Sequence, residues 1–381
     1  MQKNKALKKK LYANLKILTS NVNLFTIFLV LLFSYILCFC FQTNIEMGLN
    51  KCYNYDKLNL EGLNIYFFNV GQGDCSFVEF PDGKTMIVDS GTEQSSKKTI
   101  DFIVNKVLKD KPLIIDYLIL THSDTDHCGG MLNFVNAFQI NNIIRPRIYD
   151  VYNNSNVDLS RDNISLSNYY TEDNLYYHNL IENFYNEPNC NVYFLDINKF
   201  NNELKIKSDS SLFYYDLTFY SPQTYYYGNS DEGLNNMSAV FSLNYNDRKI
   251  LFTGDMSSKV ELNLIDNLEE VDVLKVAHHG SKYSSCEQFV EKLKPKYSII
   301  SVGKNSYGHP STNVINNLNN INSKIYRTDK EGTLVLNIEN NNIKIYNLGI
   351  NSYYIQVLHL YLGVVLIVLI AQIFIAINKI N

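Results

Sequence analysis

Hydrophobic and polar positions in the central part of the chain form short runs that predict β-strands. Apolar runs over residues 64–70, 76–80 and 85–88 each end in a glycine-containing turn, of which Pro81-Asp82-Gly83 is one. Glycine and Asp-Gly pairs supply the positive φ angles that tight turns require, so the three runs predict a β-meander. Apolar residues at helical spacing follow and predict a helix near residues 100–108.

Beyond this meander, the chain predicts strands in alternation with helices. The predicted elements are a strand at 114–120, a hairpin at 238–253, a helix at 260–268, a strand at 272–277, a helix at 289–293, a strand at 297–302 and a hairpin at 333–346. Residues 147–236 are rich in Asn, Tyr, Ser and Asp, and predict a variable insertion of short strands and long surface loops. Strands that first pair and then alternate with helices indicate an α/β fold with two sheets flanked by helices.

Each end of the chain carries a long apolar run. Residues 24–41 contain no charge and follow six lysines in the first 16 positions, and the second run lies within residues 355–377. About 20 apolar residues cross the hydrocarbon core of a bilayer. Because positive flanks stay in the cytoplasm, we expect a cytoplasmic tail and a central domain on the outer side of the cell membrane.

The two runs therefore divide the chain into segments. We predict a basic tail at 1–23, a transmembrane helix at 24–41, a linker at 42–60, a folded domain at 61–350 and a second transmembrane helix at 355–377. A cleaved signal peptide is the alternative for the first run, but the run is long for one and lacks an A-x-A cleavage pattern. Two buried core helices are the alternative for both runs.

Composition narrows the choice of partners. The formal net charge is −4, from 34 basic and 38 acidic side chains, so no global positive field predicts nucleic-acid binding. Any contact with nucleic acid must come from a local patch. The 46% hydrophobic content is sufficient for a sizeable core.

Four polar side chains crowd the end of the predicted strand 114–120: His122, Asp124, Asp126 and His127. Imidazole and carboxylate together suit Zn²⁺ or Mn²⁺ better than Ca²⁺, which prefers oxygen ligands alone. Taken alone, such a run is equally consistent with a solvated turn.

Two further predicted strands end in residues of the same kind. One ends at Asp255 and the other at His278-His279. Strands of one sheet can place their carboxyl ends along one edge, where clefts form. Three strand ends that carry ligand-type residues therefore favour a metal site over a solvated turn.

The order of these motifs resembles the metallo-β-lactamase superfamily and, within it, the hydrolase domain of ComEC-type DNA-uptake proteins. The matching pieces are Asn69-Val-Gly-Gln-Gly-Asp74, Val88-Asp-Ser-Gly91, Thr121-His-Ser-Asp-Thr-Asp-His-Cys-Gly-Gly130, Thr253-Gly-Asp255, Val276-Ala-His-His-Gly-Ser281 and Tyr307-Gly-His-Pro310. They cover nearly all of the segment between the apolar runs except residues 147–236. The resemblance implies a four-layer αββα metallo-β-lactamase sandwich, here flanked by the two predicted transmembrane helices.

The resemblance also implies a site for two divalent cations, Zn²⁺ or Mn²⁺. One ion would be held by His122 and Asp124 and the other by Asp126 and His127. Asp255 would bridge the two ions, and His278 or His279 would complete the shell. Such a pair activates a hydroxide and clamps the oxygens of a phosphoryl group, so Asp126 and Asp255 are the predicted catalytic residues.

Four other residues are candidates for substrate contact or catalysis. His309 would protonate a leaving group or touch phosphate, or it would only cap its turn. Lys282 would contact a phosphate oxygen, or it would be a solvated surface lysine. Asn236 and Ser238 occupy a slot in which most members of the superfamily supply another histidine, and we predict them as substrate contacts.

The resemblance implies a membrane-anchored metallo-hydrolase of phosphodiesters, with DNA as substrate and partner. DNA-uptake proteins of this type also contain a multi-helix channel domain, whereas this chain shows two candidate spans. A channel would therefore be a separate protein. The alternatives are an envelope phosphodiesterase for phosphocholine-type substrates and a catalytically degenerate binding module.

Overall fold

The computed structural model describes residues 58, 60–146, 172–195, 206–208, 212–223 and 231–348. All of them lie in one compact unit, Tyr53–Gly349. The predicted transmembrane helices at 24–41 and 355–377 and the basic tail at 1–23 lie outside the described residues, as does most of the linker. Within the described ranges, no helix is long and apolar enough to cross a membrane.

The first layer of strands is an eight-stranded sheet in the order β16-β15-β1-β2-β3-β5-β7-β8. Its strands are β1 (Leu63–Phe67), β2 (Ser76–Glu79), β3 (Thr85–Val88), β5 (Tyr117–Ile119), β7 (Asn142–Pro146), β8 (Asn191–Leu195), β15 (Leu334–Glu339) and β16 (Asn342–Asn347). Antiparallel pairing of β1, β2 and β3 confirms the predicted meander. From β3 to β8 the pairing is parallel.

The second layer is a six-stranded sheet in the order β14-β13-β12-β11-β10-β9. Its strands are β9 (Tyr215–Ser221), β10 (Val240–Tyr245), β11 (Arg248–Phe252), β12 (Val273–Lys275), β13 (Tyr297–Ile300) and β14 (Lys324–Arg327). The hairpin β10–β11 is antiparallel as predicted, and β11 to β14 run parallel. Two short strands, β4 (Ile114–Ile115) and β6 (Gln139–Ile140), pair separately.

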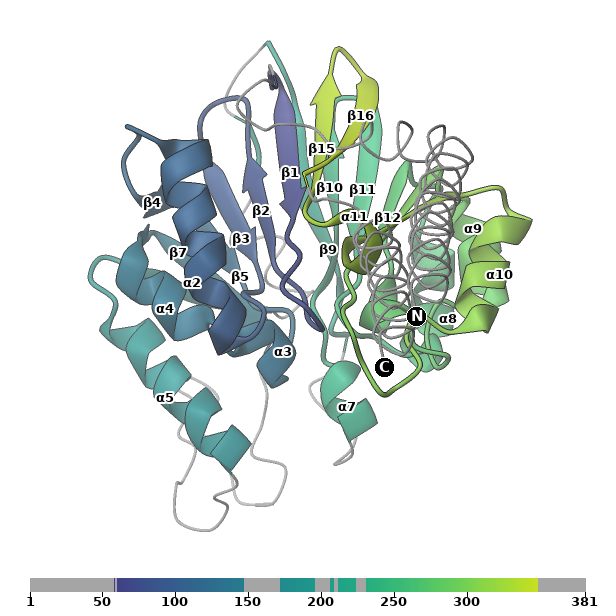
Figure 1. The fold of residues 1–381 in the computed structure, drawn as a ribbon, viewed down its shortest axis with the longest axis horizontal. Coiled ribbons are helices and arrows are strands. Elements are labelled where there is room, and N and C mark those ends of the chain that lie inside the picture. The colour runs from purple at the N-terminus through teal and green to yellow at the C-terminus, as the bar shows by residue number, and fades with distance from the viewer. Residues whose placement is uncertain are drawn as a thin grey trace, which may run out of the picture. The chain divides into compact units, whose positions relative to one another are not determined.

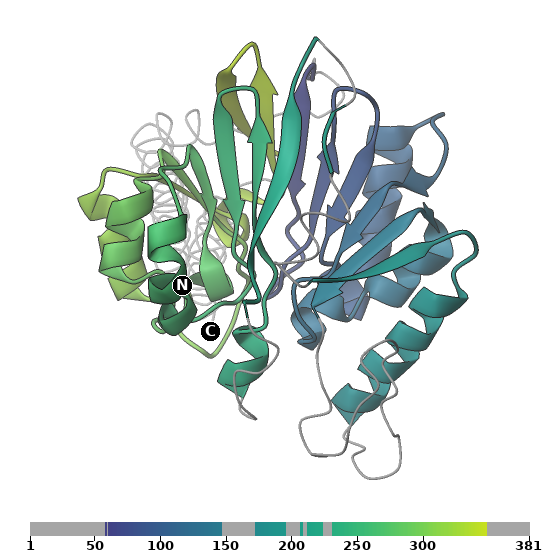
Figure 2. The ribbon, with the colours of Figure 1, turned by 180° about the vertical axis from the view of Figure 1, so that it is seen from behind.

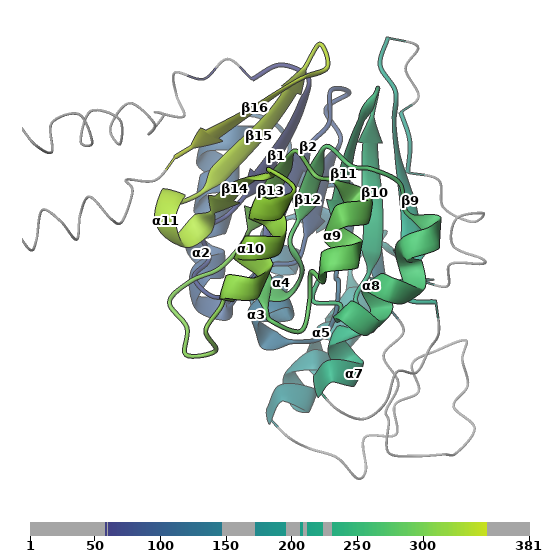
Figure 3. The ribbon, with the colours of Figure 1, turned by 90° about the vertical axis from the view of Figure 1, so that its right-hand side faces the viewer.

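Helices form the two outer layers. Along the first half they are α2 (Glu93–Phe102), the π-helix η2 (Ile103–Leu108), α3 (Thr125–Cys128), α4 (Met131–Ala137) and α5 (Glu172–Asn186). The others are α7 (Asp231–Asn235), α8 (Ser258–Leu264), η3 (Ile265–Asn267), η4 (Ala277–Gly280), α9 (Glu287–Leu293), α10 (Thr312–Asn320) and α11 (Thr328–Glu331). Figures 1 and 2 show α2, α4 and α5 on the outer face of the first sheet. Figure 3 shows α8, α9 and α10 on the second.

Alternating side chains along β1 explain this layering. Leu63, Ile65 and Phe67 belong to the core between the sheets, whereas Tyr66 belongs to the core under the helices. Since side chains of a strand point to opposite faces in turn, a strand such as β1 that is buried at every position must be covered on both faces. The predicted four-layer αββα sandwich is thereby confirmed.

Within the interval 147–236, the residues that the structure describes include one helix and two strands. It contributes α5 to an outer layer, β8 to the first sheet and β9 to the second. Tyr177, Leu180, Ile181 and Phe184 are buried at helical spacing along α5. Polar residues fill the positions between them, namely His178, Asn179, Glu182 and Asn183, so the apolar stripe is hard to recognise in the sequence. The short strands predicted for this interval are confirmed by β8 and β9, whereas the helix α5 was not predicted.

Candidate metal centre

The first set of candidate ligands lies where the chain leaves β5 and enters α3. Asp124 is the N-cap residue of α3, and Asp126 and His127 lie inside the helix. His122 and His127 are fully buried, whereas the side chains of Asp124 and Asp126 are 34% and 30% exposed. The cluster therefore has a buried imidazole side and a carboxylate side open to solvent.

Asp255 approaches the cluster from the second sheet, just after β11. Its backbone N–H donates to the Ser238 hydroxyl at 2.9 Å. Gly254 precedes it with φ +49°, and a Cβ at Gly254 would lie 2.7 Å from the Ser238 side chain. A residue without a side chain is needed here so that the loop can pass beside Ser238.

The pair His278-His279 follows β12 in the short helix η4. Both residues adopt positive φ angles, 50° and 53°. Such conformations are costly for residues with a side chain and persist where surrounding contacts enforce them. The His278 N–H donates to the Gly254 carbonyl at 3.1 Å, so the Asp255 and His279 loops are bonded directly to each other.

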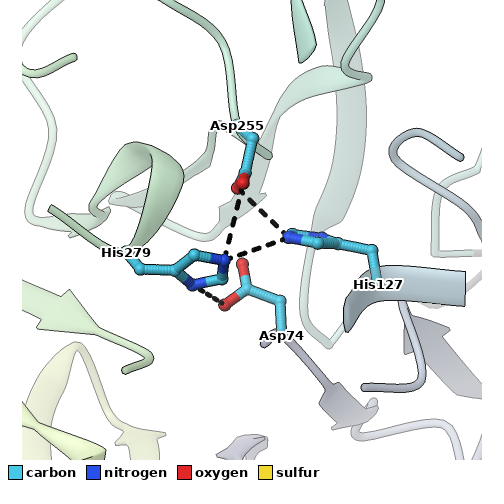
Figure 4. A group of neighbouring side chains, drawn as sticks. All are labelled: Asp74, His127, Asp255 and His279. Atoms are coloured by element: carbon cyan, nitrogen blue, oxygen red, sulfur yellow. Dashed lines mark hydrogen bonds and ion pairs between the residues drawn. The ribbon is translucent and has the colours of Figure 1, made fainter. Parts of the chain in front are cut away.

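The Asp255 carboxylate contacts several imidazoles, and Figure 4 shows its contacts with His127 and His279. Its Oδ1 is 3.2 Å from Nε2 of His127. Its Oδ2 is 3.5 Å from Nε2 of His279, 3.7 Å from Nε2 of His278 and 4.0 Å from Nε2 of His122. The structure thus brings together His122 to His127 and two loops, at Asp255 and at His278-His279, that lie more than a hundred residues further along the chain.

The ligand-type atoms fall into two neighbouring groups that share Asp255. In one group, Nε2 of His122 lies 3.6 Å from Oδ2 of Asp124. In the other, Nε2 of His279 lies 3.1 Å from Oδ2 of Asp126 and 3.4 Å from Nε2 of His127. Every predicted metal ligand is therefore at this centre. His279 is 2% exposed and joins the second group, whereas His278 is 25% exposed and lies near Asp255.

Hydrogen bonds to the far side of each ring fix the imidazoles. Nδ1 of His127 is 2.7 Å from Oδ2 of Asp89, and Nδ1 of His279 is 2.9 Å from the Ser301 carbonyl. Nδ1 of His122 is 3.0 Å from the Thr121 hydroxyl. In each ring Nε2 is left to face the centre, which is the arrangement found around metal-ligating histidines.

Asp74 is a further member of the cluster that was not among the predicted ligands. Its Oδ2 forms a 2.6 Å ion pair with the buried Lys275, and its Oδ1 is 3.5 Å from Nδ1 of His279. Burial alone would raise the pKa of the Asp74 carboxyl, but Lys275 and then His279 hold it well below its usual range. Asp74, Asp89 and Lys275 complete the site. Asp74 lies in the motif Asn69–Asp74 and Asp89 in the motif Val88–Gly91, and Lys275 is the last residue of an apolar strand.

The electrostatics of the centre favour positive charge. Burial lowers the pKa of His279, but Asp255, Asp126 and Asp74 outweigh it and raise that pKa to about 10. Burial raises the pKa of Asp255, and His127, His279 and His278 outweigh it and hold that pKa well below its usual range. A pocket that stabilises protonated imidazoles beside ionised carboxylates also stabilises a bound cation.

The donor set fits divalent cations. Ligand atoms of Asp74, His127, Asp255 and His279 lie within 4.8 Å of one another. Nε2 of His122 is buried without a hydrogen-bond partner in the part of the chain that the structure describes. Buried polar atoms without partners are costly, and coordination would satisfy them. Mixed imidazole and carboxylate donors match Zn²⁺ or Mn²⁺.

The other predicted residues lie in different surroundings. The His309 ring is 5.4 Å from that of His278, and burial followed by the nearby His278 and His279 lowers its pKa to about 4. Lys282 is exposed on the loop after His279. Asn236 and Ser238 are 2% and 0% exposed, and their predicted contact with substrate stays a prediction. Their side chains accept hydrogen bonds from the backbone N–H groups of Ser257 and Asp255, and these bonds hold the loop that carries Asp255.

Comparison with known proteins agrees with this geometry. Residues 68–187 match the family model described as the metallo-beta-lactamase superfamily. The chain is 28% identical over 309 residues to ComE operon protein 3 of Bacillus subtilis (strain 168), an alignment that covers 75% of this chain and 34% of that protein. It is 24% identical over 278 residues to Recombination protein 2 of Haemophilus influenzae (strain ATCC 51907 / DSM 11121 / KW20 / Rd), covering 73% and 29%.

A third relative is Competence protein ComA of Neisseria gonorrhoeae, which is 32% identical over 127 residues, or 32% of this chain and 18% of that protein. The chain thus spans about a third or less of the length of these curated relatives.

Proposed function

The chain belongs to the metallo-β-lactamase superfamily, and from that premise we propose that it is a metal-dependent phosphodiesterase whose substrate is DNA. The observation that carries the proposal is the position of Asp255. Its Oδ1 lies 3.2 Å from Nε2 of His127, and its Oδ2 lies 3.5 Å from Nε2 of His279 and 4.0 Å from Nε2 of His122. A single carboxylate shared by two sets of ligands is suited to a pair of cations.

The roles of the residues follow from this arrangement. His122, Asp124 and Asp255 would hold one divalent ion, and Asp126, His127, His279 and Asp255 would hold the other. Bound there, the ions would activate water at neutral pH and neutralise charge on a phosphoryl group. Asp89, Thr121 and Ser301 would keep the Nε2 atoms aimed inward by holding Nδ1 of the three rings.

Solvent reaches the centre from the side of Asp124, Asp126 and His278, so substrate would enter there. His309 is placed beside His278 on this side. A neutral imidazole offers one N–H donor, which would contact a phosphate oxygen.

DNA as the substrate rests on the relatives. Two of them are named for recombination and competence, processes that act on DNA. We extend the proposal to a protein anchored in the cell membrane by the runs at 24–41 and 355–377, with its hydrolase domain outside and a separate protein as a DNA channel. Protease treatment of intact cells tests the orientation, since a cytoplasmic hydrolase domain would be protected.

The function is tested with the purified full chain, loaded with Mn²⁺ or Zn²⁺, on single-stranded DNA and on bis(p-nitrophenyl) phosphate. We expect cleavage of both, and loss of both activities in Asp126→Ala and Asp255→Ala. Asp101→Ala, a change at an exposed position of α2, is the matched control. Cleavage of the small diester without DNA would favour the envelope phosphodiesterase. Inactivity with either cation, or unchanged turnover in both variants, would overturn the proposal.

A further inference from the structure

Two loops border the solvent-exposed side of the metal centre and are bonded to each other. One, residues 280–285, follows His279, and the other, residues 303–311, follows β13. The Ser311 N–H donates to the Gly280 carbonyl at 2.8 Å. A Cβ at Gly280 would lie 2.5 Å from the Pro310 side chain, so the two backbones pass in close contact.

Tyr307 projects from the second loop into solvent. It is 75% exposed, the highest value among the large aromatic side chains that the structure describes. The loop beneath it is held by Asn305, whose Oδ1 accepts hydrogen bonds from the N–H groups of Tyr307 and His309. Nδ2 of Asn305 donates to the Gly303 and His309 carbonyls. These hydrogen bonds hold the loop that presents the exposed Tyr307 ring.

A series of rings leads from Tyr307 to the candidate metal ligands. The Tyr307 and His309 rings lie 5.6 Å apart with an interplanar angle of 30°. The His309 ring in turn lies 5.4 Å from His278 and 6.4 Å from His279. A planar group resting on Tyr307 would thus lie next to a phosphate positioned at the centre.

Positive side chains accompany the ring on the same two loops. Lys304 and Lys282 are both exposed. An exposed aromatic ring with nearby lysines suits a nucleic-acid strand, because bases stack on the ring while the cations contact the backbone. A duplex offers no such contact, because its bases are already stacked on one another.

From these observations we propose that Tyr307 is a stacking platform for a nucleobase next to the cleaved phosphodiester, which makes single-stranded nucleic acid the preferred substrate. This inference rests on the proposed phosphodiesterase function. It adds a specificity-determining residue that binds the base, whereas the metal centre acts on the phosphate.

The test compares a single-stranded oligonucleotide, the same strand with an abasic site at its centre, and the corresponding duplex. Binding is measured by fluorescence anisotropy in an Asp126→Asn background, and kcat and KM are measured in the otherwise unchanged chain. Tyr307→Ala removes the ring and Tyr307→Phe retains it. Tyr214→Ala is the distant control, because Tyr214 is 54% exposed and lies next to the β10–β11 turn, at the end of the sheet opposite Asp255.

We expect Tyr307→Ala to raise Kd and KM for the intact strand roughly 10-fold, the effect of losing one base–aromatic stack. The variant should also bind intact and abasic strands equally. Tyr307→Phe and Tyr214→Ala should stay within about twofold of the parent protein, because stacking needs only the ring at position 307. Unchanged binding in Tyr307→Ala, an equal loss for the abasic strand, or equal affinity for strand and duplex would overturn this inference alone. Absence of any DNA binding or cleavage in the parent protein would overturn the proposed function as well.

Discussion

The Asp89 carboxylate lies 2.7 Å from Nδ1 of His127, on the side of the ring opposite the nitrogen that faces Asp255. The same carboxylate accepts hydrogen bonds from the N–H and hydroxyl of Thr121 at 2.8 and 2.7 Å. Thr121 in turn contacts His122. One buried acid therefore orients imidazoles in both groups of the centre.

Asp89→Asn should weaken metal binding without removing a ligand. The amide cannot polarise the His127 ring as a carboxylate does, and loss of such a partner typically costs 10–100-fold in affinity. Competition of the purified chain with a zinc-binding dye measures the change. Asp101→Asn removes a carboxylate from the exposed face of α2 and should leave the affinity unchanged. Equal affinities in the parent protein and Asp89→Asn would show that Asp89 does not support the metal centre.

Gly73→Ala should damage the same centre through the backbone. Gly73 has φ +139°, and a Cβ there would lie 2.3 Å from the Asp126 carbonyl oxygen. The loop that carries Asp126 would have to move, and Asp74 would lose its 3.1 Å hydrogen bond to that carbonyl. We expect metal affinity to fall at least about 10-fold, as for lost supporting contacts, together with a lower melting temperature.

Gly71→Ala is the matched control for this change. Gly71 also has a positive φ, +80°, but a Cβ there would meet nothing within 4 Å. It should cost only the conformational strain of about 1–2 kcal/mol and leave metal affinity intact. If both variants lose metal equally, the clash at Asp126 is not the cause.

Metal removal should lower the melting temperature of the protein, and replacement of Asp255 should make that decrease smaller. A cation at 100 times its Kd stabilises the folded state by ~2.7 kcal/mol, which corresponds to roughly 5–10 °C for a domain of this size. Chelation should lower the melting temperature of the parent protein by this amount. In Asp255→Asn the shift should be less than about half as large, because the shared carboxylate is lost. A chelator-insensitive melting temperature in the parent protein would contradict a metal centre.

The strand ends of the site could be predicted from the sequence because each follows an apolar run and is closed by glycine. This local pattern predicts the positions of His122 to His127, of Asp255 and of His278-His279. The choice between His278 and His279 could not be predicted, because it depends on φ angles of 50° and 53° that turn the two rings apart. Asp74 could not be placed either, since it reaches His279 only through the pairing of its loop with Asp126.

In the fold, too, some elements are specified by the local sequence and others depend on pairing with distant segments. The meander and the hairpin β10–β11 have strong period-two patterns and short turns, which specify local pairing. β9 lies in an Asn- and Tyr-rich interval, and its membership of the second sheet is fixed by pairing with β10 after a long intervening segment. Substrate contact was predicted for Asn236 and Ser238 from their place in a motif, whereas their burial follows from the packing of the Asp255 loop.

Glu261 is a buried acid away from the metal centre. It lies on α8 with 0% exposure and accepts hydrogen bonds from the backbone N–H groups of Ser285 and Cys286, at the start of α9. Burial raises the pKa of its carboxyl to about 7, and the two N–H donors oppose that rise only in part. Its contacts join two helices that cover the second sheet.

Stability should therefore fall as pH rises through the range from about 4.5 to about 7. In this range the unfolded chain has released the Glu261 proton, whereas the folded chain still holds it, so a rise in pH favours unfolding. The loss in the free energy of unfolding is complete above pH 7 and amounts to about 3 kcal/mol. Glu261→Gln removes the titration. Urea unfolding at pH 5, 6, 7 and 8 should show that the free energy of unfolding of the parent protein falls relative to that of Glu261→Gln as pH rises. Glu291→Gln, at an exposed position of α9, controls for the loss of one charge. A pH-independent difference between the parent protein and Glu261→Gln would show that Glu261 is ionised in both states.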